Sequence, residues 1–200
     1  PSGVYIPVPD TGAVPAMPDN DAFRIALVGS LYHAEDLYTL LAGIRTWAGE
    51  RQVRSLRPAI VEYYGDESDR LAAATREWGD VCEIRMSGFV PPADLARRLR
   101  TSHVNAFVNA RSGFRHKVLE LAVAGRPILC LPAVGTDECN IVRDAGGKLY
   151  NCATAVDVRN ALDDLGRAKV PDAGTSVDVG KFSWDTRSAA LEAVLEQVLK

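Results

Sequence analysis

Short apolar runs alternate with amphipathic stretches along most of this chain. The apolar runs predict strands at Arg24–Val28, Ala59–Tyr64, Val81–Met86, Val104–Val108, Pro127–Leu131 and, briefly, Leu149–Tyr150. The stretches between them carry apolar residues at helical spacing and predict helices at Glu35–Trp47, Asp66–Trp78, Pro92–Arg100, Phe114–Ala124, Asp137–Asp144 and Ala155–Leu165. Short, uniformly apolar strands between helices are typical of a mostly parallel sheet covered on both faces. We therefore expect a doubly wound, Rossmann-like α/β domain.

The two ends of the chain depart from this alternation. Residues 1–22 are rich in Pro, Gly and Asp and predict an extended lead-in or linker, so the domain is expected to cover residues 23–170. Within residues 171–200 an irregular segment precedes a long amphipathic helix, Trp184–Leu199. Its apolar stripe includes Ala189 and Leu195, and it can pack either on this domain or on a part of a longer protein.

Composition and charge narrow the possible partners. The 200 residues carry a formal net charge of −3, which argues against a nucleic-acid partner. The four cysteines form no C-x-x-C pair and do not cluster with the three histidines, so we expect no metal site and free thiols in a reducing compartment. Neither a transmembrane run nor a signal-peptide pattern occurs, and we expect a cytoplasmic protein.

The loop after the first strand excludes several common cofactors. It begins Gly29-Ser30-Leu31-Tyr32, whereas a dinucleotide fingerprint requires G-x-G-x-x-G so that the backbone can approach a pyrophosphate. The chain also lacks a Walker loop and a G-x-S-x-G elbow. We therefore expect no bound NAD or FAD and no other cofactor.

The most informative segment runs from Ser112 to Leu131. It predicts a loop, one helix, a glycine stop and a buried strand, and the free N–H groups at the helix start favour phosphate. Arg111, Arg115 and Lys117 are the nearby cations, and Glu120 lies on the same helical face, where its carboxylate can accept hydrogen bonds from sugar hydroxyls. Each of these side chains can instead be an ordinary exposed residue. Together they indicate a nucleotide or nucleotide-sugar ligand.

This segment resembles the donor-binding helix of retaining GT-B glycosyltransferases of group 1, the family 4-like enzymes. Their hallmark is a Glu, seven residues and a second Glu, followed by a small-residue helix end, Gly-x-Pro and a strand; Glu120 and the run Leu121–Pro127 match its second half. Further matches occur in the expected order at Pro1–Val4, Gly29–Tyr32, Gly88–Pro91 and Phe182–Trp184.

The resemblance implies that this chain is the C-terminal, donor-binding half of an enzyme that moves a sugar from a nucleoside-diphosphate sugar to an acceptor hydroxyl. Glu120 would hold the ribose hydroxyls, Phe89 and Val90 would flank the base, and Gly29 and Ser30 would form the loop after the first strand. The backbone that holds the diphosphate and sugar would come from Gly113, Phe114, Arg115, Lys117, Val118 and Leu119. The N-terminal acceptor domain would be a separate partner, so no catalytic residue is assigned and the isolated domain is expected to be inactive.

Three positions depart from the family pattern. Ser112 replaces the first Glu of the hallmark, and Ser30 and Glu35 stand where the family places an Arg and a Lys against the diphosphate. Lys117, three residues before Glu120, fits a variant of the pattern. Either Arg111, Arg115 or Lys117 supplies the missing charge, or donor binding is weak or lost. The alternatives are a degenerate, non-catalytic module used for docking or assembly and an epimerase on the same fold, which would need further acids and histidines in the crevice.

Overall fold

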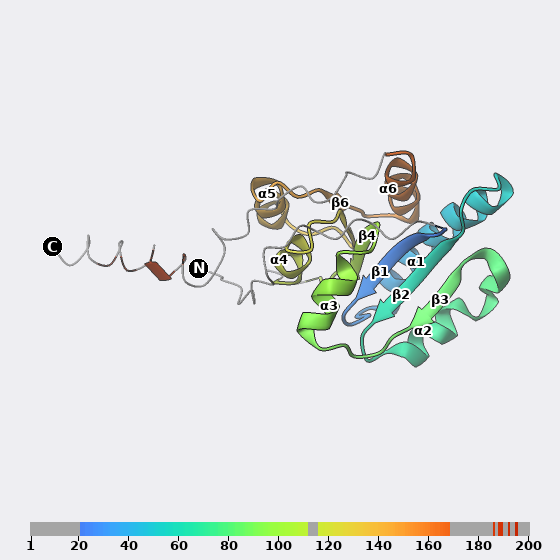
Figure 1. Ribbon diagram of the computed structural model, residues 1–200, viewed down its shortest axis with the longest axis horizontal. Helices are drawn as coiled ribbons and strands as arrows, with labels where there is room; N and C mark the ends of the chain where they lie inside the picture. The colour runs from blue at the N-terminus through green and yellow to red at the C-terminus, as the bar shows by residue number, and fades with distance from the viewer. Residues whose placement is uncertain are drawn as a thin grey trace.

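The strands of the sheet follow the predicted apolar runs closely. The computed structural model describes residues 21–111 and 116–168, together with residues 186, 188, 189, 192 and 195. The strands in this part of the chain are β1 (Phe23–Val28), β2 (Ala59–Tyr64), β3 (Glu83–Met86), β4 (Val104–Val108), β5 (Ile128–Leu131) and β6 (Leu149–Asn151). They form one sheet in the order β3-β2-β1-β4-β5-β6, and every pair is parallel (Figure 1).

Helices cover both faces of this sheet, as the uniformly apolar strands predict. They are α1 (Ala34–Val53), α2 (Ser68–Thr75), α3 (Pro92–Leu99), α4 (His116–Ala122), α5 (Thr136–Asp144) and α6 (Ala155–Arg167). Apolar side chains of α1, α2 and α6 pack with alternate strand residues in one core cluster, and those of α3, α4 and α5 pack in a second cluster on the opposite face. The predicted doubly wound, Rossmann-like α/β fold is therefore confirmed.

Helix α1 extends well beyond the predicted end at Trp47. Its last turns are held by polar contacts: the Arg51 guanidinium lies 4.7 Å from the Trp47 ring and donates to the Arg57 carbonyl, with Nη2 to O at 3.1 Å. Glu50 forms an ion pair with Arg159 of α6, with 2.6 Å between Oε2 and Nη2. Hydrophobic spacing cannot reveal these partners, because it records only the apolar face of a helix.

The helix predicted at Asp66–Trp78 is shorter than expected. α2 ends at Thr75 and gives way to a 3-10 segment, Arg76–Val81. Gly79 within it has a φ of +56°, a left-handed conformation that reverses the chain toward β3, while Trp78 is buried. The apolar spacing of a helix thus extends in the sequence past Thr75, although the chain there forms a 3-10 turn that is packed against the rest of the domain.

Residues near the chain ends are described only in part. The predicted lead-in lies outside the described residues except for positions 21 and 22. Residues 186, 188, 189, 192 and 195 are helical, in agreement with the predicted C-terminal helix, and Ala189 and Leu195 of its apolar stripe are exposed. None of the helices among the described residues is long and apolar enough to cross a membrane.

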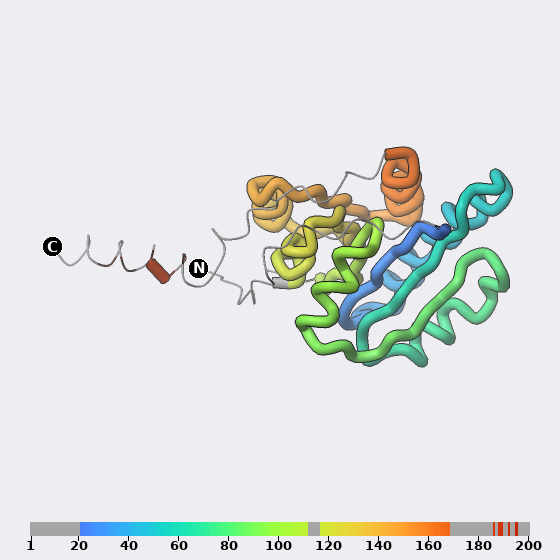
Figure 2. Tube along the Cα trace, in the orientation of Figure 1, coloured from blue at the N-terminus to red at the C-terminus, as the bar shows by residue number. Residues whose placement is uncertain are grey.

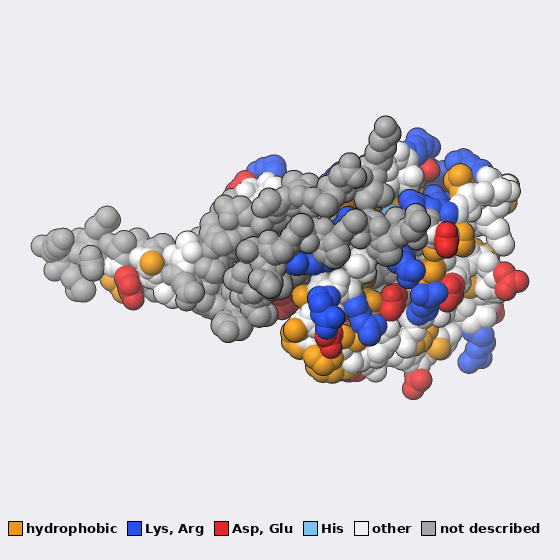
Figure 3. Space-filling model, in the orientation of Figure 1, with side chains coloured by type: hydrophobic (Ala, Val, Ile, Leu, Met, Phe, Trp, Pro, Cys, Tyr) orange, Lys and Arg blue, Asp and Glu red, His pale blue; other side chains and the backbone are white. Residues whose placement is uncertain are grey.

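The chain reverses its direction of winding between β1 and β4. From β1 it proceeds to β2 and β3 on one side, and then α3 returns it to β4 on the other side of β1 (Figure 2). In open α/β sheets, ligands bind at such a switch point, outside the carboxyl ends of the strands. On the face shown in Figure 3, acidic and basic side chains are interspersed over the described surface.

Candidate functional site

The loop after β1 is held in place by the loop after β2. The Tyr63 hydroxyl donates to the Gly29 carbonyl over 2.9 Å and accepts from the Glu67 N–H over 3.2 Å. Glu67 in turn accepts from the Leu31 N–H, with 2.6 Å between N and Oε2. A Cβ on Gly65 would lie 2.3 Å from the Tyr63 hydroxyl oxygen, so only glycine fits there. The Gly29–Leu31 backbone is therefore fixed before any ligand arrives.

Lys117 of α4 reaches across to this loop. A Cβ built on Gly29, whose φ is +88°, would lie 3.5 Å from Lys117 Cε and 3.8 Å from Nζ. Lys117 and Ser30 also line one small pocket between the ends of β1 and β4. The tertiary structure thus brings together Gly29, Ser30 and Lys117, which are far apart in the sequence, at the switch point.

Glu120 lies beside Lys117 on the outer side of α4. Its Oε2 is 2.8 Å from Lys117 Nζ, and both side chains remain partly exposed. A spacing of three residues places two side chains next to each other on a helix. The arrangement offers a carboxylate for hydroxyl groups and an ammonium for an anion within one short helix face.

The two residues between them have a different role. The side chains of Val118 and Leu119 are 0% and 2% exposed, respectively. They belong to the hydrophobic interior and cannot contact a ligand, which leaves only their backbone for the donor contact that the resemblance implies. The other residues predicted for this contact, Gly113, Phe114 and Arg115, lie outside the described residues, as does Ser112.

Arg111 is directed away from this cluster and toward the start of α1. Its Nε and Nη2 are each 3.0 Å from a carboxylate oxygen of Asp36, and Nη2 is 3.5 Å from Glu35. The hydrogen bonds and charge of Asp36 raise the pKa of Arg111. Of the three cations considered as replacements for the missing family charges, Arg111 is therefore balanced by acids, Arg115 lies outside the described residues, and Lys117 is placed at the β1 loop.

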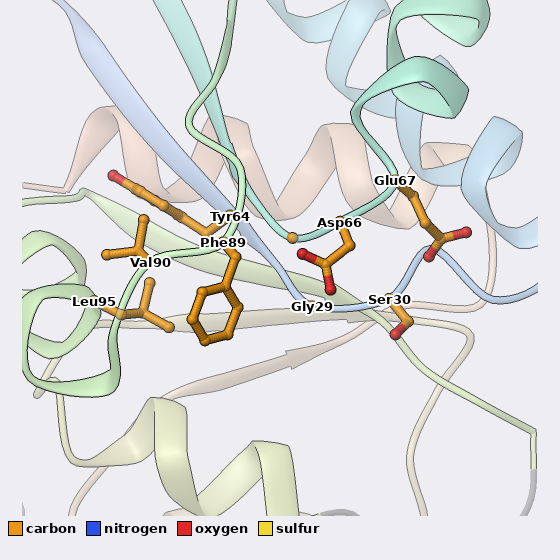
Figure 4. A pocket seen from close by; sticks show the side chains of 9 residues that line it. Gly29, Ser30, Tyr64, Asp66, Glu67, Phe89, Val90 and Leu95 are labelled. Carbon is orange, nitrogen blue, oxygen red and sulfur yellow. The ribbon is translucent and has the colours of Figure 1, made fainter.

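Phe89 and Val90 line a second, larger pocket over the ends of β1 and β2. Its volume is about 190 Å³, and its walls are Gly29, Ser30, Tyr64, Gly65, Asp66, Glu67, Phe89, Val90 and Leu95 (Figure 4). The Phe89 side chain is 74% exposed, which leaves a ring face available to a planar ligand. Phe89, Val90 and Leu95 make one side of the pocket apolar, whereas Asp66 and Glu67 make the other side polar.

Tyr64 forms a rigid part of this wall. Burial and the neighbouring Glu62 carboxylate raise the pKa of its phenol, so the hydroxyl stays neutral. The Arg98 guanidinium lies 5.8 Å from the centre of its ring, and the Ser87 hydroxyl donates to Glu62 over 3.0 Å. These contacts hold in place the part of the pocket wall that lies next to the loop carrying Phe89.

Asn109 is a candidate that sequence reasoning missed. It follows directly after β4, is 6% exposed, and lines the same small pocket as Ser30 and Lys117. Its Nδ2 donates to the Ala133 carbonyl over 3.3 Å, while its Oδ1 has no hydrogen-bond partner among the described residues. A buried acceptor without a partner is costly, so a ligand group or a water molecule is expected to donate to it. The available signal was a polar residue at the end of an apolar run.

No metal centre is evident at either pocket. Among the described residues, no three His, Cys, Asp or Glu side chains are grouped so that they could hold a metal ion. Cys82, Cys130, Cys139 and Cys152 are free, and burial raises the pKa of the Cys130 thiol to about 12. That thiol therefore stays protonated and inert.

Comparison with known proteins gives a fold match without a sequence match. No family model matches the chain, and no curated protein matches it. Among solved structures, the apo form of the lipopolysaccharide outer core galactosyltransferase WaaB matches with a TM-score of 0.66 at 16% identity, over 98% of this chain and 54% of that chain. HepE from Anabaena, in complex with UDP and glucose, matches with a TM-score of 0.64 at 14% identity, over 88% and 48% of the two chains.

A third matching structure is an epimerase and not a glycosyltransferase. A UDP-N-acetylglucosamine 2-epimerase has a TM-score of 0.53 at 16% identity, over 90% of this chain and 45% of that chain. The chain shares the Rossmann-like α/β fold of these GT-B-type proteins. It spans about half the length of each. At such identities the likeness concerns the fold alone.

Proposed function

We propose that this chain is the donor-binding half of a retaining glycosyltransferase that uses a nucleoside-diphosphate sugar. The observation that carries the proposal is the convergence of Lys117, Glu120 and the Gly29 loop at the switch point of the sheet. An ammonium beside a preformed loop suits a diphosphate, and a carboxylate one helical turn away suits the ribose hydroxyls. The pocket beside Phe89 and Val90 is then the place for the base.

Each group has a defined part in this proposal. Lys117 leaves its ion pair with Glu120 and turns toward the diphosphate, which frees the Glu120 carboxylate for two hydroxyl groups. The Gly29–Leu31 backbone approaches the phosphates without rearrangement, because Tyr63 and Glu67 already hold it. Stabilising the diphosphate leaving group while an acceptor hydroxyl attacks is an electrostatic task of the kind that preorganised groups perform.

The acceptor would be held by an N-terminal half that completes the enzyme. The chain spans about half the length of the solved structures that it resembles, which supports this part of the proposal. The isolated chain is accordingly expected to bind a donor but to transfer no sugar. Four free cysteines are compatible with a reducing compartment, and a cytoplasmic location is part of the same proposal.

Calorimetry with a panel of nucleoside diphosphates and their sugars tests the proposal. Glu120→Ala is expected to weaken binding at least about tenfold, because hydrogen bonds to a charged group contribute roughly 1.5–3 kcal/mol. Glu77→Ala is the matched control, since Glu77 is an exposed glutamate in Arg76–Val81, which precedes the edge strand β3. Absence of binding to every diphosphate, by a chain shown to be folded, would refute the proposal.

A non-catalytic docking module is the second candidate, and one observation favours it. Arg111 is balanced by Asp36 and Glu35, and Lys117 is paired with Glu120, so both described cations beside the crevice already have acidic partners. If those pairs persist, the crevice offers little net attraction to a diphosphate. The same calorimetric panel separates the two candidates, because a docking module would bind none of the ligands.

A further inference from the structure

The Asp66 carboxylate lies in the larger pocket. It follows Gly65 directly, is exposed, and lines the pocket with Phe89. Among the described residues, no hydrogen bond or ion pair joins its carboxylate to another group. Figure 4 shows the carboxylate directed into the space that the Phe89 ring also faces. Its acceptor oxygens are therefore available to a ligand.

The carboxylate of the neighbouring Glu67, in contrast to that of Asp66, is already engaged in hydrogen bonds. Glu67 accepts from the Leu31 N–H over 2.6 Å and from Arg70 Nη1 over 3.0 Å, so its carboxylate is occupied in holding the β1 loop. The backbone before Asp66 is fixed, because a Cβ on Gly65 would collide with the Tyr63 hydroxyl and the Gly29 carbonyl. Glu67 thus holds the pocket wall in place, whereas Asp66 follows a fixed backbone position and directs its carboxylate into the pocket.

Phe89 supplies a stacking surface beside this acceptor. Its ring is 74% exposed at the tip of a loop that Gly88, with a φ of +66°, turns outward. Val90 and Leu95 continue the apolar wall. Proteins recognise single bases by stacking them on such a ring while polar groups read the base edge. The pocket therefore has both components of a base-recognition site.

The chemistry of the polar component selects among bases. A carboxylate only accepts hydrogen bonds, and its two oxygens can accept from two adjacent donors. Guanine presents N1–H and N2–H side by side, whereas uracil presents a single N3–H between two carbonyl oxygens that a carboxylate repels. Adenine offers one donor next to an acceptor. Among these three bases, only guanine matches both carboxylate oxygens.

We propose that the pocket between Asp66 and Phe89 selects a guanine nucleotide, with the base stacked on Phe89 and its N1–H and N2–H donated to the Asp66 carboxylate. This inference rests on the proposed nucleotide-sugar function and defines its substrate as a GDP-sugar. It separates this chain from the structural neighbour that holds UDP, which is only 14% identical to it.

Calorimetry of the 200-residue chain with GDP, UDP and ADP tests the selection. GDP is expected to bind at least about tenfold more tightly than UDP, the discrimination of one good bidentate base contact. Asp66→Asn is expected to weaken GDP binding about tenfold or more and to leave UDP binding unchanged or stronger. The same variant should gain affinity for xanthosine diphosphate, whose C2 carbonyl can accept from the new amide.

A matched control separates base recognition from general charge. Asp69→Asn removes the same charge from an exposed position in the first turn of α2, and its ratio of GDP to UDP affinity is expected to equal that of the unmodified chain. Equal effects of Asp66→Asn on all three diphosphates would overturn the inference, because they would show only a loss of charge. Tighter binding of UDP than of GDP would overturn it as well, yet leave the donor-binding proposal intact. Failure to bind any diphosphate would instead defeat both.

Discussion

Lys117 Nζ lies 2.8 Å from Glu120 Oε2, and the end of the same lysine side chain lies over Gly29 at the end of β1. One side chain therefore connects the proposed ribose-binding group on α4 with the loop at the switch point. The pair is partly exposed, so it contributes little to stability.

Removal of the Lys117 charge should weaken donor binding while leaving the fold intact. Lys117→Met retains much of the aliphatic stem and is expected to lower affinity for nucleoside diphosphates roughly tenfold or more, as for a lost charge-assisted hydrogen bond. The melting temperature should change little, because exposed ion pairs contribute about 0–1 kcal/mol. Lys148→Met is the control, since Lys148 directly precedes the edge strand β6 and is likewise paired with an acid, Asp164. Equal affinities for the two variants would contradict a ligand role for Lys117.

A side chain at Gly29 should affect both stability and binding. Gly29→Ala places a residue with a Cβ atom at a φ of +88° and is expected to lower the free energy of unfolding by about 1–2 kcal/mol. The new methyl group also contacts Lys117 Cε, so diphosphate affinity should fall. Gly49→Ala, inside α1, places a Cβ in ordinary van der Waals contact with Val81 Cγ1 at 3.9 Å and should instead raise the free energy of unfolding by about 0.5–1 kcal/mol. Urea denaturation of both variants measures the contrast, and a neutral Gly29→Ala would argue against this loop geometry.

Loss of the Tyr63 hydroxyl should loosen the loop after β1. Tyr63→Phe leaves the Gly29 carbonyl and the Glu67 N–H without their shared partner and should cost about 1–3 kcal/mol of unfolding free energy. Tyr38→Phe removes a hydroxyl from an exposed position of α1, and its effect should stay within about 0.5 kcal/mol. Hydrogen exchange of the Leu31 amide provides a local measurement, and exchange at the unmodified rate in Tyr63→Phe would show that the loop does not depend on the hydroxyl.

His103 should make the fold sensitive to acid. Burial and the surrounding arginines, Arg57 foremost among them, lower its pKa from the ordinary 6.5 to about 3. The unfolded chain therefore binds the proton more readily, so the native state is fully stable above pH 6.5 and loses stability as the pH falls toward 3. The slope from this one group is at most about 1.4 kcal/mol per pH unit.

A variant that does not titrate isolates this contribution. His103→Asn retains an acceptor for the Arg24 N–H, which donates to His103 Nδ1 over 3.0 Å, and should flatten the acid dependence of stability. His33→Gln, at an exposed histidine before α1, should leave the dependence unchanged. Denaturation series between pH 7 and pH 4 measure both, and a parallel loss of stability in His103→Asn would attribute it to other groups.

The periodicity of the chain was sufficient to predict the sheet and the helices around it. The strand Val104–Val108 is buried at every position because both faces of the sheet are covered, and four of its five residues are apolar, a pattern that is local in the sequence. Element ends were less predictable. α1 continues past Trp47 through Arg51, and α2 ends before Trp78, because partners distant in the sequence determine both ends.

Local patterns also marked much of the candidate site. Glu120, Lys117, Gly29, Phe89 and Val90 were each singled out by position in a motif or at the end of a predicted strand. Asn109 and Asp66 were not named as binding residues, because what distinguishes them is an oxygen acceptor that has no hydrogen-bond partner among the described residues. Whether an acceptor has a hydrogen-bond partner depends on all the segments that fold around it, so it cannot be predicted from a local stretch of sequence.

The amino-acid sequence alone therefore determined the alternation of strands and helices, the two-sided burial of the sheet and the choice of α4 as the helix to examine. Only the tertiary structure decided how the charges are distributed. It paired Arg111 with Asp36, placed Lys117 over Gly29 and left the Asp66 carboxylate open in the Phe89 pocket. The reason is physical: burial follows a short-range period along the chain, whereas a charged group takes the partner that folding brings within a few ångströms of it.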